Sequence, residues 1–184
     1  MTEVTVRRAS VDDAAGIGRV QVQGWHEAYT GRMPQAILDR LDVGRSTNAW
    51  RRVLAGVVAG DESDIWVAER AHTIVGFASS GACRDEDATP GRRELFAMYV
   101  LAEHYGTGVG QALVDAAIGD AAASLWMLED NPRARAFYRR NGFEPDGHVK
   151  DDDRWGEPVR EVRLIRRGGA GESPDALDPV PRGT

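Results

Sequence analysis

The chain has 184 residues, of which 42% are hydrophobic and 28% charged. These proportions are typical of one folded globular domain and argue against a disordered, collagen-like or coiled-coil protein. Its 29 acidic residues outnumber 23 basic ones, for a net charge of -6, so we expect neither nucleic acid nor an anionic membrane as a partner. Cys83 is the single cysteine, which excludes an intramolecular disulfide and a cysteine-based zinc cluster and favours a reducing compartment.

No membrane-spanning or secretory segment is expected, because no stretch approaches about 20 apolar residues and the first ten residues alternate. Near the end of the chain glycine and proline replace large apolar residues. We therefore predict one domain over residues 1–166, a flexible tail over residues 167–184, and a cytoplasmic location. The four histidines are scattered along the chain, so no metal site is predicted.

The first third of the chain predicts one strand followed by helices. Apolar residues alternate at the start and then recur at helical spacing until Gly31 and Pro34 interrupt them. The predicted elements are a strand at 4–8 and helices at 10–29, 34–41 and 46–58.

Beyond Gly60 the hydrophobic pattern changes to that of extended structure, with a tight turn near residues 70–72. Two later helices are indicated by their N-terminal signals, a glycine-rich turn and the Asn-Pro pair at 131–132. The predicted elements are strands at 64–69, 73–82 and 94–100, a helix at 106–123, a strand at 125–128, a helix at 131–142, and strands at 143–149 and 159–165. This order predicts an α/β chain with a mixed sheet.

The glycine-rich turn, residues 105–110, reads Tyr-Gly-Thr-Gly-Val-Gly and opens the helix at 106–123. Glycines let the backbone approach a ligand, and a helix N-terminus offers unpaired N–H donors, so the turn suits a phosphate without any basic side chain. The alternative is that the glycines only serve a tight connection. The turn is not a Walker loop, because Gln111 follows Gly110, and it lacks the third glycine of the dinucleotide fingerprint.

A second motif, residues 126–143, reads Trp-Met-Leu-Glu-Asp-Asn-Pro-Arg-Ala-Arg-Ala-Phe-Tyr-Arg-Arg-Asn-Gly-Phe. Together with Leu-Phe-Ala-Met-Tyr-Val at 95–100 and the glycine turn, it resembles the GCN5-related N-acetyltransferase (GNAT) family. The resemblance is strongest over residues 94–143 and extends more loosely to residues 25–34. It implies an α/β fold with a mixed, mostly antiparallel central sheet, flanked by helices and splayed to form an acetyl-CoA cleft. It also implies transfer of the acetyl group to a primary amine by direct attack.

The resemblance assigns acetyl-CoA, as co-substrate, to the glycine turn and to the strand before it. Backbone amides of the turn would bind the pyrophosphate, a role that falls on Gly106, Thr107, Gly108, Val109 and Gly110. The pantetheine arm would pair with the strand backbone at Met98 and Val100. Asn131, a helix cap on sequence grounds, would also contact the cofactor. The chain departs from the family at Tyr105, where arginine or glutamine is common.

Tyr138 matches the family position that serves the departing thiolate, and it is the predicted general acid, since a phenol can donate a proton or a hydrogen bond to sulfur. The alternative is that its ring only packs. Glu94 is the candidate base for the attacking amine, because it lies on the same strand as the expected carbonyl site and alternates with Phe96 and Met98. The alternatives for Glu94 are a strand bulge that turns its side chain away, a solvated carboxylate, and deprotonation through water.

The acceptor side is predicted around Trp25, Glu27 and Tyr29, because aromatic rings beside a carboxylate suit a cationic amine. Helical packing would explain these residues equally well. A small-molecule amine and a protein N-terminus both remain as acceptors, and the family resemblance leaves a homodimer open. The rival functions are a non-catalytic acyl-CoA-binding or sensing module and an acyltransferase with a longer acyl donor.

Overall fold

The computed structural model describes residues 3–56, 63–153 and 158–168. The predicted tail therefore lies outside the described residues apart from positions 167 and 168. The helices are α1 (Ala14–Tyr29), α2 (Gln35–Leu38), α3 (Val43–Leu54), α4 (Val109–Ile118) and α5 (Pro132–Arg140), with 3-10 turns at Val11–Asp13 and Ala102–His104. The strands are β1 (Val4–Arg8), β2 (Asp64–Arg70), β3 (Thr73–Ala82), β4 (Arg93–Val100), β5 (Ala123–Leu128), β6 (Glu144–Asp152) and β7 (Val159–Arg166).

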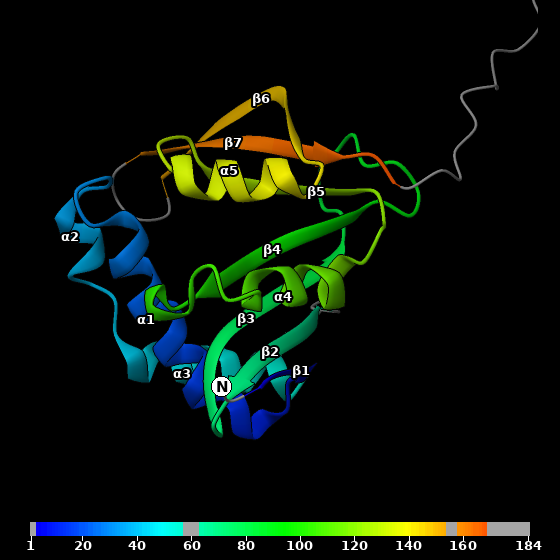
Figure 1. Ribbon diagram of the computed structural model, residues 1–184. Helices are drawn as coiled ribbons and strands as arrows, with labels where there is room; N and C mark the ends of the chain where they lie inside the picture. The colour runs from blue at the N-terminus through cyan, green and yellow to red at the C-terminus, as the bar shows by residue number, and fades with distance from the viewer. Residues whose placement is uncertain (1–2, 57–62, 154–157, 169–184) are drawn as a thin grey trace, which may run out of the picture.

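The described strands form a seven-stranded sheet in the order β1-β2-β3-β4-β5-β7-β6 (Figure 1). Neighbouring strands are antiparallel except β4 and β5, which are parallel and joined through α4. A parallel pair needs a crossover connection, and α4 supplies it. The structure confirms the predicted mixed, mostly antiparallel sheet.

The sheet splays between β4 and β5. Their ladder contains only the pairs from Arg93 with Ala123 to Leu95 with Leu125, while β4 continues beside β3 as far as Val100. In Figure 1, β5, β7, β6 and α5 accordingly lie above β1–β4 and α4. The far half of β4 thus keeps one partner strand and leaves its other edge open.

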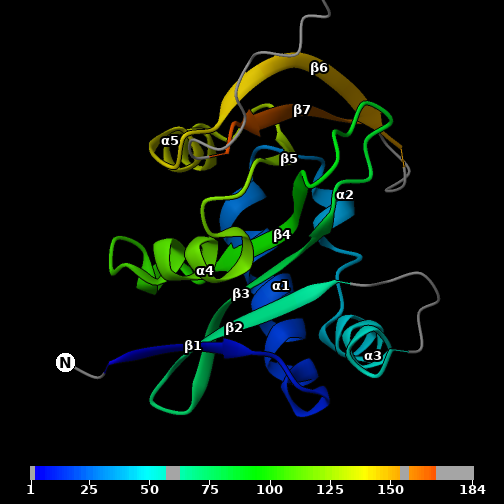
Figure 2. The same cartoon turned by 90° about the vertical axis from the view of Figure 1, so that its right-hand side faces the viewer.

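Helices cover both faces of the sheet, and each face has its own core. Helix α4 packs with α5 on one face, over a cluster that includes Leu95, Leu113 and Phe143. Helices α1 and α3 pack on the other face, where Ile17 and Phe77 are fully buried. Figure 2 shows α4 and α5 on one side of the strands and α3 on the other.

Helix α1 approaches β4 closely at its C-terminal half. A Cβ atom added at Gly24 would lie 3.1 Å from Tyr99 Cδ1, which is tighter than ordinary van der Waals contact, so a residue without a side chain suits this crossing. The other end of α1 is anchored by Asp13, whose carboxylate accepts hydrogen bonds of 2.7 and 2.8 Å from the Arg7 guanidinium. Both contacts fix the helix that carries the predicted acceptor residues.

Helix boundaries differ from the predicted ones where capping decides them. Helix α3 begins at Val43 because Asp42 Oδ1 accepts a hydrogen bond from Arg45 N; the final predicted positions, 57 and 58, lie outside the described residues. Helix α4 begins at Val109, because Gly106 and Gly108 adopt left-handed conformations. None of the helices in the described part of the chain is long and apolar enough to cross a membrane.

Candidate active site

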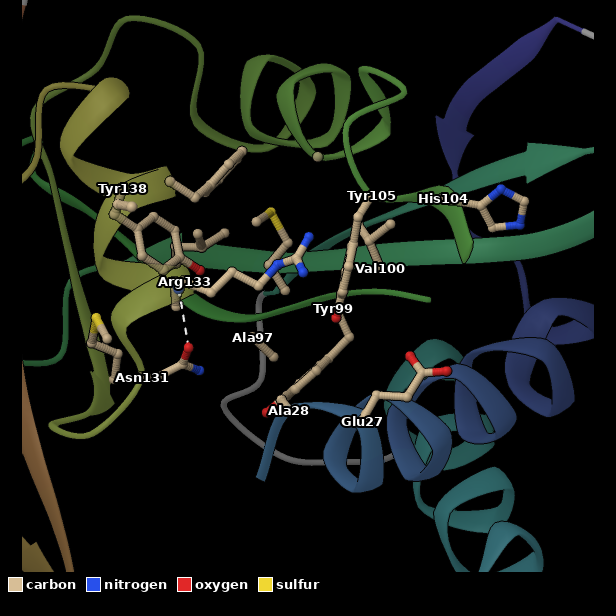
Figure 3. Close-up of a pocket in the computed structure, with 18 of the residues that line it drawn as sticks. Glu27, Ala28, Ala97, Tyr99, Val100, His104, Tyr105, Asn131, Arg133 and Tyr138 are labelled. Carbon is tan, nitrogen blue, oxygen red and sulfur yellow. Dashed lines mark hydrogen bonds between the residues drawn. The ribbon is translucent and has the colours of Figure 1, made fainter. Parts of the chain in front are cut away.

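A cavity of about 710 Å³ lies where β4 and β5 separate. Its walls come from the end of α1, the open half of β4, the glycine turn, β5 and the first turns of α5 (Figure 3). This volume is in the range of small-molecule and cofactor sites. Most predicted site residues line it, namely Glu27, Tyr29, Met98, Val100, Gly106, Gly108, Gly110, Asn131 and Tyr138.

The glycine turn lines one end of the cavity and has the geometry that suits an anion. Gly108, with φ of 90°, is the N-cap of α4 and provides no capping side chain, and the first bond within the helix runs from Ala112 N to Gly108 O. The N–H groups of the preceding helical residues therefore have no partner within the helix. A Cβ at Gly106 or Gly108 would meet no atom within 4 Å, so the backbone there is open to a ligand.

The other two residues of the turn can take part only through their backbone. Thr107 Oγ1 donates a 2.7 Å hydrogen bond to His104 O, and the Val109 side chain is completely buried. Neither side chain lines the cavity. This arrangement matches a loop that binds an anion with amides rather than with side chains.

The open edge of β4 presents backbone groups along the cavity. Leu101 N donates to Val75 O, on the β3 side, and successive residues of a strand direct their backbone groups to opposite edges. Because the β3–β4 register is regular from Ala97 to Val100, the N–H and C=O groups of Met98 and Val100 are directed toward the open side. An extended ligand can pair with them as an added strand would.

Helix α5 contributes a cap and a buried phenol. Asn131 Oδ1 accepts a 3.0 Å hydrogen bond from Ala134 N, which is the dashed line in Figure 3. Tyr138 is 8% exposed, and its ring extends from α5 toward the cavity interior (Figure 3). Burial raises the pKa of the Tyr138 hydroxyl above its usual value near 10, so the phenol stays protonated at neutral pH.

The three predicted acceptor residues have different places in the structure: two line the cavity and one packs behind it. Tyr29 lines the cavity, and burial raises the pKa of its hydroxyl. Interactions with Tyr99 and Asn131 lower this pKa, but by less than burial raises it. Glu27 also lines it, but its Oε2 atom accepts a 2.8 Å hydrogen bond from Ala102 N and so anchors the segment that leads into the glycine turn. Trp25 lies behind the wall, edge-on to Tyr29 at 5.3 Å between ring centroids.

Glu94 lies outside the cavity lining. The β3–β4 register pairs Ser79 with Ala97 and Ser80 with Leu95, so Phe96 is an extra residue in a β-bulge. The bulge reverses the alternation, and Glu94 does not share the face of Met98 as the sequence suggested. Its Oε2 atom accepts a 2.9 Å hydrogen bond from Arg84 N, and burial raises the pKa of the Glu94 carboxyl.

Sequence reasoning missed several lining residues. Tyr99 alternates with Ala97 toward α1, a signal that was available in the strand pattern. Arg133 and Phe137 are four residues apart on one face of α5, and both line the cavity. Phe96 and Trp126 also reach it, through the bulge and the splay, for which the sequence has no local signal.

The described residues contain no group of three His, Cys, Asp or Glu side chains able to hold a metal ion.

Comparison with known proteins agrees with this geometry. Residues 61–145 match the family model of the acetyltransferase (GNAT) domain. The uncharacterized N-acetyltransferase YuaI of Bacillus subtilis is 32% identical over 171 residues, which cover 88% of this chain and 91% of that protein. The chain belongs to the GNAT family. The expected family is thus confirmed for nearly the whole chain.

Solved structures of GNAT proteins share the fold. A histone acetyltransferase HPA2-related protein from Corynebacterium glutamicum has a TM-score of 0.65 at 22% identity, over 94% of this chain and 100% of its own. The structure of yncA from Salmonella typhimurium with its cofactor acetyl-CoA has a TM-score of 0.62 at 20% identity, over 94% of this chain and 98% of its own. At these identities the likeness shows a shared fold.

Proposed function

We propose that this protein is an acetyl-CoA-dependent N-acetyltransferase that transfers the acetyl group by direct attack of a bound primary amine. One observation carries the proposal: a single cavity joins an anion-binding helix N-terminus, an open strand edge and a buried phenol. Family membership and the acetyl-CoA bound to the yncA protein support it.

The residues along the cavity fit the successive parts of acetyl-CoA. The amides at the start of α4 suit a pyrophosphate, which needs N–H donors and the positive end of a helix dipole. The open β4 edge at Met98 and Val100 suits the amides of the pantetheine arm. Tyr138, from the opposite wall, suits the thioester end. This order follows the cavity from the glycine turn toward α5 (Figure 3).

In the proposed reaction the amine nitrogen, in its neutral form, attacks the acetyl carbonyl carbon and a C–N bond forms. The C–S bond breaks with its electron pair on sulfur, and the proton that the nitrogen loses passes to water. Backbone N–H groups of the open β4 edge stabilise the charge that develops on the carbonyl oxygen. Tyr138 donates a hydrogen bond to the departing sulfur. Because burial keeps the pKa of Tyr138 above that of a thiol, about 8.5, it acts through this hydrogen bond and keeps its own proton at equilibrium. The Glu94 carboxylate lies outside the cavity, so the proposal assigns it no contact with the amine.

The acceptor enters beside α1, where Tyr29 and Glu27 line the cavity. We propose a small amine or a protein N-terminus as acceptor. Aromatic rings and a carboxylate at this end favour a cationic amine. The Glu27 carboxylate already accepts hydrogen bonds from Ala102 N and Gln23 Nε2. We therefore propose that it attracts the cationic amine through its negative charge and not through a direct hydrogen bond.

The test combines thiol release with binding. The protein is incubated with acetyl-CoA and a panel of polyamines, amino acids and peptides with free N-termini, and free CoA is followed. Calorimetry on the same preparation measures CoA affinity. We expect CoA binding and turnover with at least one amine class. Binding without turnover across the panel would favour the sensing module, and absence of CoA binding would refute the proposed function.

A further inference from the structure

The glycine turn has no cation of its own. Residues 105–111 include no lysine or arginine, and Glu103 stands just before them in a chain of net charge -6. A pyrophosphate bound to this turn would therefore meet amides and a helix dipole but no balancing side-chain charge. Tyr105, the first residue of the turn, offers an aromatic ring in place of a charge.

Arg133 of α5 supplies a positive charge beside the glycine turn. The Arg133 guanidinium carbon lies 3.1 Å from the centroid of the Tyr105 ring, and Figure 3 shows the side chain reaching across the cavity from α5 to that ring. Both residues line the cavity. A cation positioned over an aromatic face is held by the ring quadrupole, so the stack places a positive charge beside the first residue of the turn.

The charge of Arg133 is not neutralised within the described part of the chain. No carboxylate there forms an ion pair with it, and its recorded contact is the Tyr105 ring. Arg32, another arginine of the cavity wall, is paired with Asp130 at 3.3 Å. Arg133 thus differs from Arg32 in keeping its N–H donors available to an anion.

We propose that Arg133 is the side-chain ligand of the acetyl-CoA pyrophosphate and that Tyr105 positions its guanidinium. The proposal rests on the proposed use of acetyl-CoA. A guanidinium is always charged and binds phosphate oxygens with two parallel hydrogen bonds. The aromatic ring at position 105 replaces a direct phosphate contact by an indirect one, since it holds a cation supplied from another element.

The binding experiment compares two arginines of the same helix. Arg133→Ala should raise the Kd for CoA about 10- to 100-fold, the loss of one charge-assisted contact. Arg135→Ala is the matched control, because Arg135 Nη2 donates to Glu129 O and the residue does not line the cavity. Its Kd should be unchanged. Both variants should keep the wild-type melting temperature, since neither residue belongs to a core cluster.

The choice of ligand locates the contact on the cofactor. Dephospho-CoA keeps the pyrophosphate and lacks the 3′-phosphate, so Arg133→Ala should weaken its binding by the same factor as for CoA. Pantetheine lacks both groups, and its affinity, measured by competition, should not change. Added salt should weaken CoA binding to the wild type more steeply than to Arg133→Ala.

Tyr105 is tested by keeping or removing its ring. Tyr105→Phe should retain wild-type CoA affinity, and Tyr105→Leu should lose part of the affinity that Arg133→Ala loses. In the Arg133→Ala background the two Tyr105 variants should bind CoA equally, because no cation remains for the ring to position. A loss with Tyr105→Leu that persists in this background would overturn the positioning role.

Three other outcomes would refute the contact between Arg133 and the pyrophosphate. Unchanged CoA affinity of Arg133→Ala, a loss confined to CoA and absent with dephospho-CoA, or an effect only on the KM of the amine would each refute the pyrophosphate contact. Wild-type protein that does not bind CoA would instead refute the proposed function, so the two failures are distinguishable.

Discussion

The hydroxyl of Tyr138 is the single group on which the proposed chemistry depends most. It is buried against Phe137 and Phe143, and burial keeps it protonated at neutral pH by raising its pKa. A hydroxyl directed into a cavity can donate its hydrogen bond to a bound ligand sulfur in place of water. The same ring also packs in the core. Replacing Tyr138 can therefore change either catalysis, through the hydroxyl, or stability, through the ring.

Tyr138→Phe should lower turnover roughly 10²- to 10³-fold, because the ring and its packing remain while the hydrogen-bond donor to the departing sulfur is lost. CoA affinity and melting temperature should change little. Tyr29→Phe is the comparison, since it removes another hydroxyl from the same cavity on the acceptor side, and it should change the KM of the amine more than kcat. Wild-type turnover in Tyr138→Phe would remove the phenol from the mechanism.

The glycine turn and α4 act as one element. The turn places Gly106 and Gly108 in left-handed conformations, and the helix that follows directs its first N–H groups into the cavity. A side chain at Gly106 or Gly108 would be unfavourable for two reasons. It would strain the left-handed backbone, and it would block access of a ligand to the backbone amides. The element therefore depends on glycine for both its conformation and its binding surface.

These two reasons can be separated with a matched pair of variants. Gly91, in the β3–β4 loop outside the cavity, also has positive φ (83°) and open space around an added Cβ. Gly108→Ala and Gly91→Ala should each cost about 1–2 kcal/mol of unfolding free energy, the strain of a left-handed alanine. Only Gly108→Ala should also weaken CoA binding, about tenfold, because its methyl group stands between amide and phosphate. Equal CoA affinities in the two variants would argue against the turn as the phosphate site.

Across the whole molecule, the splay that creates the site also weakens the sheet, since β4 and β5 share so few pairs. An ion network centred on the buried Arg163 compensates on the far side of the junction. Arg163 on β7 is 3% exposed and binds Asp87 of the β3–β4 loop through two hydrogen bonds of 2.6 and 2.7 Å. It also binds Asp146 on β6. The network thus ties the loop of one half of the sheet to the strands of the other half.

Arg163→Ala should lower the free energy of unfolding by roughly 2–4 kcal/mol, because it leaves the largely buried carboxylates of Asp85 and Asp146 without their cation. Arg160→Ala, on the same strand, removes an exposed ion pair with Glu129 and should cost roughly 0–1 kcal/mol. Urea unfolding of the two variants measures the difference. Similar stabilities would show that the network does not hold the two halves together.

Local features of the sequence predicted much of the fold and the cofactor side of the site. The glycine turn depends on neighbouring glycines and a helix N-terminus, and the Asn131 cap depends on residues three positions apart. Both features can therefore be predicted from a short segment. The family motif over residues 94–143 added the splayed sheet, which the structure confirms.

What the sequence did not determine are contacts between distant segments. The bulge at Phe96 exists only in the pairing of β4 with β3, and it moved Glu94 away from the predicted face. The stack of Arg133 on Tyr105 requires α5 to lie across the cavity from the glycine turn. Such relations depend on strand register and on how helices pack over the sheet, quantities that no single segment encodes. The sequence alone determined the glycine turn that opens α4, and the tertiary structure decided which side chains surround it.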